Sequence, residues 1–141
     1  MLATTADYRI MATGRARISL NEITFGASLF AGSVEMLVHL AGQRRAERVT
    51  LSGAMYSAEE ALALGLVDEA VQPEAVVSRA LEVAAEMAGR DLVAYAAIKH
   101  LLRGPVAERI KLAEADSIRR FVEIWYSAST REQLRKIQIR S

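Results

Sequence analysis

The sequence contains no cysteine, two prolines, few aromatic residues and almost no net charge. The absence of cysteine excludes disulfides, thiolate nucleophiles and cysteine-ligated metals. Its two histidines, His39 and His100, stand far apart in apolar helical contexts and lack the spacing of metal ligands. A net charge of +1 over 141 residues provides no strong field that would favour nucleic acid. We therefore expect no metal site and no nucleic-acid partner.

Long hydrophobic runs are also missing. No apolar stretch approaches the roughly 18 residues that a membrane-spanning helix needs. The N-terminus lacks the charged and apolar regions of a signal peptide. Hydrophobic residues nevertheless make up 52% of the chain, which is enough for a core in one domain of ordinary size. We expect a soluble cytoplasmic protein without a membrane partner.

Alternating residues predict strands mainly near the N-terminus. Tyr8–Met11 and Arg15–Leu20 have the pattern of short strands around a turn at Gly14. Residues 50–53 are predicted to be a brief extended piece that ends in a turn, and residues 66–67 a short buried strand or turn. Two or three short strands do not form an independent sheet with a sound core. We therefore expect the chain to be part of a larger fold.

The rest of the chain shows helical spacing and helix-boundary signals. Apolar residues recur at helical spacing between Ser28 and Gly42. Ser57 and Glu60 form a capping box for a helix that ends near Gly65. Further helices are predicted over 43–49, from Pro73 to Gly89, and from Asp91 to a stop at Gly104. A long amphipathic helix is predicted after Gly104. A tail helix follows it, and a capping box of Ser129 and Glu132 marks its start.

Glu22 is the candidate catalytic residue, a single carboxylate between a strand-like run and an apolar turn. Ile18, Leu20, Ile23 and Phe25 would hold its side chain against apolar neighbours. A carboxyl group in such a setting can serve as an acid and a base. The alternative is that Glu22 ends a strand and points to solvent, or caps the next helix. The chemistry of the residues leaves both interpretations open.

Several ordered blocks resemble the crotonase family, the enoyl-CoA hydratases and isomerases. Leu20-Asn21-Glu22-Ile23-Thr24-Phe25-Gly26 is similar to the family's Pro-Glu-apolar segment that ends in glycine. The most specific block joins Leu51-Ser52-Gly53, Ser57-Ala58-Glu59-Glu60-Ala61 and Gly65-Leu66-Val67-Asp68. Residues 6–10, 37–46 and Lys99 also fit the family pattern. The resemblance covers nearly the whole chain and corresponds to the family's C-terminal half.

This resemblance implies an α/β fold: the C-terminal part of a ββα spiral, mostly helical, with a few short strands near the N-terminus. Residues 1–72 would form a truncated crotonase-like ββα core and residues 73–141 a helical oligomerisation region. Loss of the N-terminal units would leave sheet edges and apolar helix faces uncovered, a state that proteins avoid by pairing or covering them. We therefore expect a homo-oligomer, a dimer or a trimer, with Phe121, Val122 and Trp125 near the interface or in the core beneath it.

The family polarises an acyl-CoA thioester carbonyl with two backbone amides, and one or two carboxylates move protons or activate water. By resemblance, acyl-CoA is the substrate, no further cofactor is needed, and Glu22 matches the second hydratase glutamate. The first glutamate falls at Met1, and both oxyanion loops lie upstream of it in the family pattern. Asn21 replaces a proline, while Phe30 and Ser33 replace glycines of a Gly-rich turn.

Phe121 and Trp125 are candidate substrate-binding residues. Phe121 falls at a position that lines the acyl pocket of a neighbouring subunit in relatives, and Trp125 shares that interpretation. The alternative for both is packing in the core, because aromatic residues at helical spacing commonly serve that role.

Three functions remain open from the sequence. The first is enoyl-CoA hydration or isomerisation with Glu22 as acid and base, if missing elements complete the site. The second is a catalytically inactive truncated homologue that acts as an oligomeric binding or assembly module. The third is a truncated gene product without a selected activity.

Overall fold

The computed structural model describes residues 2–137. Helices dominate this range and only two short strands interrupt them, which confirms the mostly helical α/β class. In chain order the elements are α1 (Leu2–Thr5), β1 (Ile10–Ala12), η1 (Glu22–Phe25), α2 (Ala31–Ala41), α3 (Gln43–Ser52), α4 (Ala58–Ala63), β2 (Glu69–Val71), η2 (Pro73–Ala75), α5 (Val76–Ala88), α6 (Leu92–Trp125) and α7 (Ala128–Lys136), where η marks a 3-10 helix.

The two strands lie side by side in parallel, with Ile10 opposite Glu69 and Ala12 opposite Val71. The chain between them passes through η1, α2, α3 and α4. The apolar faces of these helices and of the segment before β2 meet in the core, because burying them removes apolar surface from water. Its buried members are Leu37, Ala46, Val49, Tyr56, Ala61, Leu64, Leu66 and Val67.

The predicted strand over Arg15–Leu20 is wrong. Only Ile18 pairs, through an antiparallel bridge in which Ile18 and Tyr56 exchange backbone hydrogen bonds of 3.0 and 2.9 Å. The extended piece predicted at 50–53 is also wrong, because α3 continues to Ser52 and Gly53 ends it with a left-handed φ of +60°. Local alternation predicts an extended backbone, but a strand needs a partner along its length.

Two of the predicted helix caps are confirmed. Ser57 and Glu60 form the predicted capping box: the Glu60 amide donates to Ser57 Oγ at 3.3 Å, and the Ser57 amide donates to Glu60 Oε2 at 2.8 Å. Asp91 caps α6 by accepting a hydrogen bond of 2.7 Å from the Ala94 amide. These bonds satisfy amides that the first helical turn leaves unpaired.

The predicted helix stop at Gly104 is wrong, since α6 runs unbroken for 34 residues and passes through Gly104 and Pro105. A proline in a helix interior costs about 3 kcal/mol in free energy. Tertiary contacts on both sides of the proline oppose this cost, and before it Arg103 pairs with Asp7 at 2.7 Å. Val106 is buried, and Arg109 forms an ion pair of 2.7 Å with Glu35 on α2.

The second predicted capping box, Ser129 with Glu132, is also wrong. Ser127 is the N-cap of α7 and accepts a hydrogen bond of 3.2 Å from the Thr130 amide. Ser127 has the extended backbone that a cap needs, with φ −63° and ψ 152°, whereas Ser129 already lies inside the helix.

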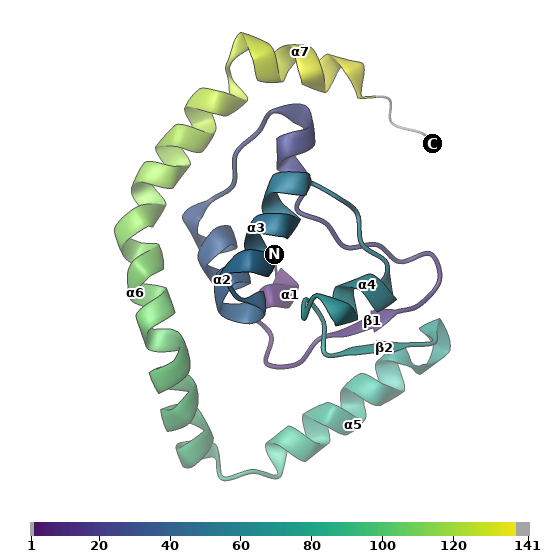
Figure 1. Cartoon of the computed structure of the whole chain (residues 1–141). Coiled ribbons are helices and arrows are strands. Elements are labelled where there is room, and N and C mark those ends of the chain that lie inside the picture. Colours follow the sequence, from purple (N-terminus) through teal and green to yellow (C-terminus); the bar gives the residue numbers. More distant parts are fainter. Residues whose placement is uncertain (1, 138–141) are drawn as a thin grey trace.

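Helices α5, α6 and α7 run around the outside of the region formed by α1–α4 and the strands (Figure 1). Helix α6 packs along α2, α5 packs against β1, and α7 contacts η1. Among the described helices, none is both long and apolar enough to cross a membrane. Many apolar side chains on α5 and α6 are exposed: Val77, Leu81, Leu92, Val93, Ile98, Leu101, Leu102, Leu112, Ile118 and Val122.

Candidate functional site

Glu22 is the first residue of η1 and is partly buried. Its Oε2 atom is inaccessible to solvent and has no hydrogen-bond partner in the described part of the chain. Nearly all buried polar side-chain atoms in native proteins have a partner, because leaving one unpaired costs free energy. An unpaired carboxylate oxygen is therefore the most unusual feature around this segment, and it lies on the residue that the sequence singles out.

The backbone of η1 is tightly held. The Ala27 amide donates to the Glu22 carbonyl at 2.9 Å, and the Gly26 amide donates to the Ile23 carbonyl at 3.2 Å. Gly26 then turns the chain with a left-handed φ of +75°, a conformation that glycine adopts without a steric penalty. These bonds fix the direction in which Glu22 leaves the backbone.

The C-terminal end of α3 forms one support for this segment. A Cβ atom placed on Gly53 would lie 2.6 Å from Thr24 Cγ2 and 2.7 Å from Ile23 Cγ2. The side chains of η1 therefore pack directly on the backbone of Gly53. The sequence places Gly53 in a turn, but only the fold shows that this glycine makes room for the residues beside Glu22.

Helix α7 forms a second support through Thr130, which is 1% exposed. Its hydroxyl donates a hydrogen bond of 2.7 Å to the Gly26 carbonyl, 104 residues away in the chain. Sequence reasoning missed Thr130, because the cap of α7 was placed two residues late. The order Ser127-Ser129-Thr130 offered several hydroxyls, and no local signal distinguished the buried one.

Phe121 and Trp125 form a third support. Their rings stack at a centroid distance of 5.6 Å on α6. Trp125 meets Phe25 of η1 edge to face at 6.3 Å, and Phe121 lies 4.4 Å from Phe30, which precedes α2. The structure thus brings the two predicted substrate-binding residues together and connects them with Glu22 through Phe25. These contacts fit the alternative of core packing, and the assignment to substrate binding stays a prediction.

The start of α2 is capped by α6. The Ala31 amide donates to Ser117 Oγ at 3.0 Å, and the Gly32 amide donates to Glu114 Oε2 at 2.9 Å. This is the segment where the family pattern has a Gly-rich turn. Because these two amides donate to Ser117 and Glu114, both amides already have hydrogen-bond partners within the chain.

Asp7 joins the N-terminal segment to α6 in a charged cluster. Its carboxylate accepts hydrogen bonds from Lys99 Nζ at 2.6 Å and Tyr95 Oη at 2.8 Å, and it pairs with Arg103 Nη2 at 2.7 Å. Burial alone would raise the pKa of Asp7, but the bonds from Lys99 and Tyr95 and the charges of Arg103 and Lys99 lower it below its ordinary value. Lys99, which fits the family pattern, therefore has a structural partner.

A second ionic contact joins β2 to α5. Arg79 binds both carboxylate oxygens of Glu69, with Nε–Oε2 at 2.9 Å and Nη2–Oε1 at 2.8 Å, and Tyr8 Oη donates to Oε1 at 2.6 Å. The hydrogen bonds from Arg79, and then that from Tyr8, hold the pKa of Glu69 at about 2. This fully engaged carboxylate contrasts with that of Glu22.

Neither histidine joins a metal site in the described residues, since no cluster of three or more acidic or histidine side chains there could hold a metal ion. His39 lies on α2 and His100 on α6. Met1, where the family's first glutamate would fall, lies outside the described residues.

Comparison with known proteins adds an independent line of evidence. A family model described as Enoyl-CoA hydratase/isomerase matches residues 1–136. The chain is 35% identical over 118 residues to mouse mitochondrial enoyl-CoA delta isomerase 1, covering 82% of this chain and 41% of that protein. It is 34% identical over 128 residues to the probable enoyl-CoA hydratase echA17 of Mycobacterium avium, covering 88% of this chain and 48% of that protein.

A solved structure is also similar to this chain. The crystal structure of human mitochondrial delta3-delta2-enoyl-CoA isomerase superimposes with a TM-score of 0.88 at 31% identity, over 95% of this chain and 52% of that chain. Similarity therefore extends over nearly all of the present chain, which spans about half the length of the relatives it matches.

Proposed function

This chain belongs to the enoyl-CoA hydratase/isomerase family, and from that premise we propose that it is the glutamate-bearing part of an enzyme acting on enoyl-CoA thioesters. In this proposal Glu22 is the acid and base. Phe121 and Trp125 are proposed to border the acyl group. The chain spans about half the length of its relatives, so other elements, or a second chain, would supply the amides that polarise the thioester carbonyl.

The observation that carries the proposal is the unpaired oxygen of Glu22. Every other carboxylate discussed above has a structural partner: Asp7 has Lys99 and Arg103, and Glu69 has Arg79. A carboxylate that is partly buried, unpaired and rigidly supported can exchange a proton with a bound molecule without first breaking an internal bond.

One carboxylate is sufficient for moving a double bond. As a base it removes a proton from the carbon between the double bond and the thioester carbonyl, and as an acid it returns that proton to the far carbon of the former double bond. The enolate formed between these steps needs oxyanion donors from outside this segment. Hydration also requires an activated water molecule, so isomerisation makes the smaller demand on Glu22. We propose isomerisation as the first reaction to test.

The test compares two substrates under the same conditions. A 3-enoyl-CoA would gain absorbance of the conjugated thioester if it is isomerised, and crotonyl-CoA would lose that absorbance if it is hydrated. Glu22→Gln keeps the shape of the side chain and should reduce turnover by about 100- to 10,000-fold, the range for a general acid or base. Glu123→Gln, a change at an exposed carboxylate on α6, is the matched control and should leave turnover unchanged.

Turnover that survives Glu22→Gln would refute the role of Glu22. Absence of turnover, together with no rise in melting temperature when acyl-CoA is added, would refute both catalysis and CoA binding.

The second candidate is an oligomeric binding or assembly module without catalysis. The exposed apolar residues of α5 and α6 favour it, since burying them against another chain would remove apolar surface from water. Leu101 is 75% exposed and Leu112 86% exposed, on the helix that carries Phe121 and Trp125. We propose a homo-oligomer, a dimer or a trimer, in either case. A monodisperse monomer in light scattering at micromolar concentration would contradict it.

A further inference from the structure

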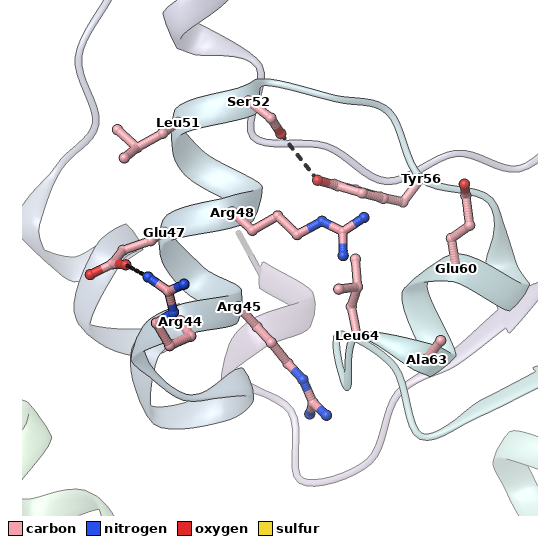
Figure 2. Close-up of a pocket in the computed structure, with 10 residues that line it drawn as sticks. All are labelled: Arg44, Arg45, Glu47, Arg48, Leu51, Ser52, Tyr56, Glu60, Ala63 and Leu64. Atoms are coloured by element: carbon pink, nitrogen blue, oxygen red, sulfur yellow. Dashed lines mark hydrogen bonds and ion pairs between the residues drawn. The ribbon is translucent and has the colours of Figure 1, made fainter.

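A hollow of about 910 Å³ lies between α3 and α4, and its lining does not include Glu22, Phe121 or Trp125. Figure 2 shows its walls: α3 on one side, and α4 with the loop leading into it on the other. The lining residues are Arg44, Arg45, Glu47, Arg48, Leu51, Ser52, Tyr56, Glu60, Ala63 and Leu64. Neither the enoyl-CoA chemistry nor the support of η1 assigns a task to this cluster.

Two of the three arginines have no internal partner. Within residues 2–137, Arg45 and Arg48 form no ion pair and no side-chain hydrogen bond, whereas Arg44 pairs with Glu47 at 3.7 Å. Their spacing of three residues places Arg45 and Arg48 on the same face of α3. Both residues are exposed, so their guanidinium groups are accessible to a ligand, and a guanidinium fork suits a carboxylate or a phosphate.

Both side chains reach across the hollow. In Figure 2 Arg48 extends from α3 to the space between Tyr56 and Leu64, and Arg45 extends past Leu64 on the other side. Arg45 Nη1 would lie 3.4 Å from a Cβ atom on Gly65, so this guanidinium lies close over the turn after α4. The two guanidinium groups therefore border the same hollow from one helix.

Ser52 at the end of α3 and Tyr56 on the opposite wall add hydroxyl groups, and the opposite wall also adds an apolar surface. Ser52 Oγ and Tyr56 Oη lie 3.1 Å apart, and the ring of Tyr56 belongs to the buried core, so its position is fixed. The side chain of Leu64 lies beside it. A bound molecule would thus meet cationic forks, hydroxyls and an apolar face together.

The acids of the hollow are already engaged. Glu47 accepts a hydrogen bond of 2.9 Å from Gln43 and pairs with Arg44, and the carboxylate of Glu60 accepts the Ser57 amide as part of the capping box. Glu60 still opposes an anion by its charge. A singly charged ligand would gain little beside it, whereas a group with two negative charges can pair with both free guanidinium groups.

We propose that this hollow binds the phosphate group of a small soluble molecule, a phosphomonoester or a diphosphate. The planar forks of Arg45 and Arg48 match the geometry of phosphate oxygens. The volume exceeds what a single phosphate fills, and the apolar face of Tyr56 and Leu64 suits a ring or chain attached to the phosphate. The proposal does not depend on the reaction of Glu22.

The experiment titrates the protein with inorganic pyrophosphate, ADP and acetate by calorimetry. The wild type should bind pyrophosphate and ADP, more weakly as salt is raised, and should not bind acetate. The double variant R45Q/R48Q should lose affinity by about tenfold or more, since hydrogen bonds to charged groups are the strong ones. R45K/R48K keeps the charge but loses the forks, and should fall between the two.

Arg15→Gln is the control for net charge. Arg15 is exposed, does not line the hollow and has no ion pair in the described chain. The single variant Arg45→Gln removes the same one charge from the hollow, and an equal loss of affinity in R15Q and R45Q would show unspecific attraction and overturn the proposal. The proposal is also overturned if the wild type binds no phosphate probe, or if acetate binds as tightly as pyrophosphate.

Two further measurements distinguish other roles of Arg45 and Arg48 from phosphate binding. Binding to vesicles that contain anionic lipid, without binding to soluble phosphate, would assign them to a membrane surface. A change of oligomeric state in R45Q/R48Q, seen by light scattering without phosphate binding in the wild type, would assign them to a protein interface. Either result refutes the proposed site, and circular dichroism of each variant verifies that it is folded.

Discussion

The clearest test of how the fold supports Glu22 is the substitution Thr130→Val. Valine has nearly the shape of threonine, so the change opens no large cavity. It removes the hydroxyl bond of 2.7 Å to the Gly26 carbonyl and the bond of 3.2 Å that the hydroxyl accepts from Ser127 Oγ. A typical internal hydrogen bond contributes about 0.5–1.5 kcal/mol, and a buried acceptor left without a partner costs about 1–3 kcal/mol. Thr130 itself is 1% exposed, but Gly26 lies at the surface, so water can partly replace the lost hydroxyl and the cost lies in the lower part of this range.

We expect Thr130→Val to reduce the free energy of unfolding by about 1–2 kcal/mol. For a chain of this size that corresponds to a fall in melting temperature of about 3–6 °C. Thr130→Ser is the matched control, since it keeps the hydroxyl and removes one methyl group. Its expected cost is about 1 kcal/mol, below that of the valine variant if the hydrogen bond is the main contribution.

The assay joins global stability with local protection. Thermal unfolding followed by circular dichroism gives the first quantity. Hydrogen exchange gives the second, at the Gly26 and Ala27 amides that close η1. Exchange at these amides should rise more in Thr130→Val than exchange in the middle of α3. If Thr130→Ser costs more stability than Thr130→Val, or if these amides stay equally protected, the hydrogen bond does not hold the Glu22 segment and our reasoning fails.

Three further predictions follow from the same contacts. Gly53→Ala should reduce the free energy of unfolding by about 1–3 kcal/mol, because a Cβ atom at φ +60° would collide with η1. Chemical denaturation measures this loss, and an unchanged midpoint would contradict the close packing. Acid should destabilise the protein as the pH falls from about 4.5 towards 2. The reason is that the folded-state pKa values of Asp7 and Glu69 are lowered, that of Glu69 to about 2. Both carboxylates therefore stabilise the fold fully above their unfolded-state pKa values, and this stabilisation is lost as the pH falls through their folded-state pKa values. The variants Asp7→Asn and Glu69→Gln should each flatten this dependence of melting temperature on pH, and an unchanged slope would refute the assignment. Ser57→Ala should cost about 1 kcal/mol through the lost cap of α4, whereas Ser57→Gly should cost only a few tenths.

Local patterns predicted the elements that depend on neighbouring residues. The capping box at Ser57, the cap at Asp91 and the helix end at Gly42 each involve groups within one helical turn, so their geometry follows from short stretches of sequence. The strand at 15–20 and the stop at Gly104 were mispredicted because partners decide both. The first lacks a neighbouring strand along its length, and α2 holds the helix beyond the second.

The candidate site divides in the same way. The sequence pointed to Glu22 as an unusual carboxylate, and the resemblance to the family gave it a role. The sequence did not reveal the unpaired Oε2 atom of Glu22, the contact of η1 with Gly53 or the hydrogen bond from Thr130 to the Gly26 carbonyl. These features join residues far apart in the chain, and periodicity along a helix carries no information about such distances.

By itself, the sequence determined the family, the mostly helical class and the identity of the candidate acid and base. Those follow from residue order and from hydrogen bonds that close within a helical turn. Only the tertiary structure decided that Trp125 and Thr130 support the Glu22 segment and that Arg45 and Arg48 border one hollow without partners. The physical reason is that burial and charge pairing depend on which surfaces meet, and that is settled only when distant segments of the chain pack together.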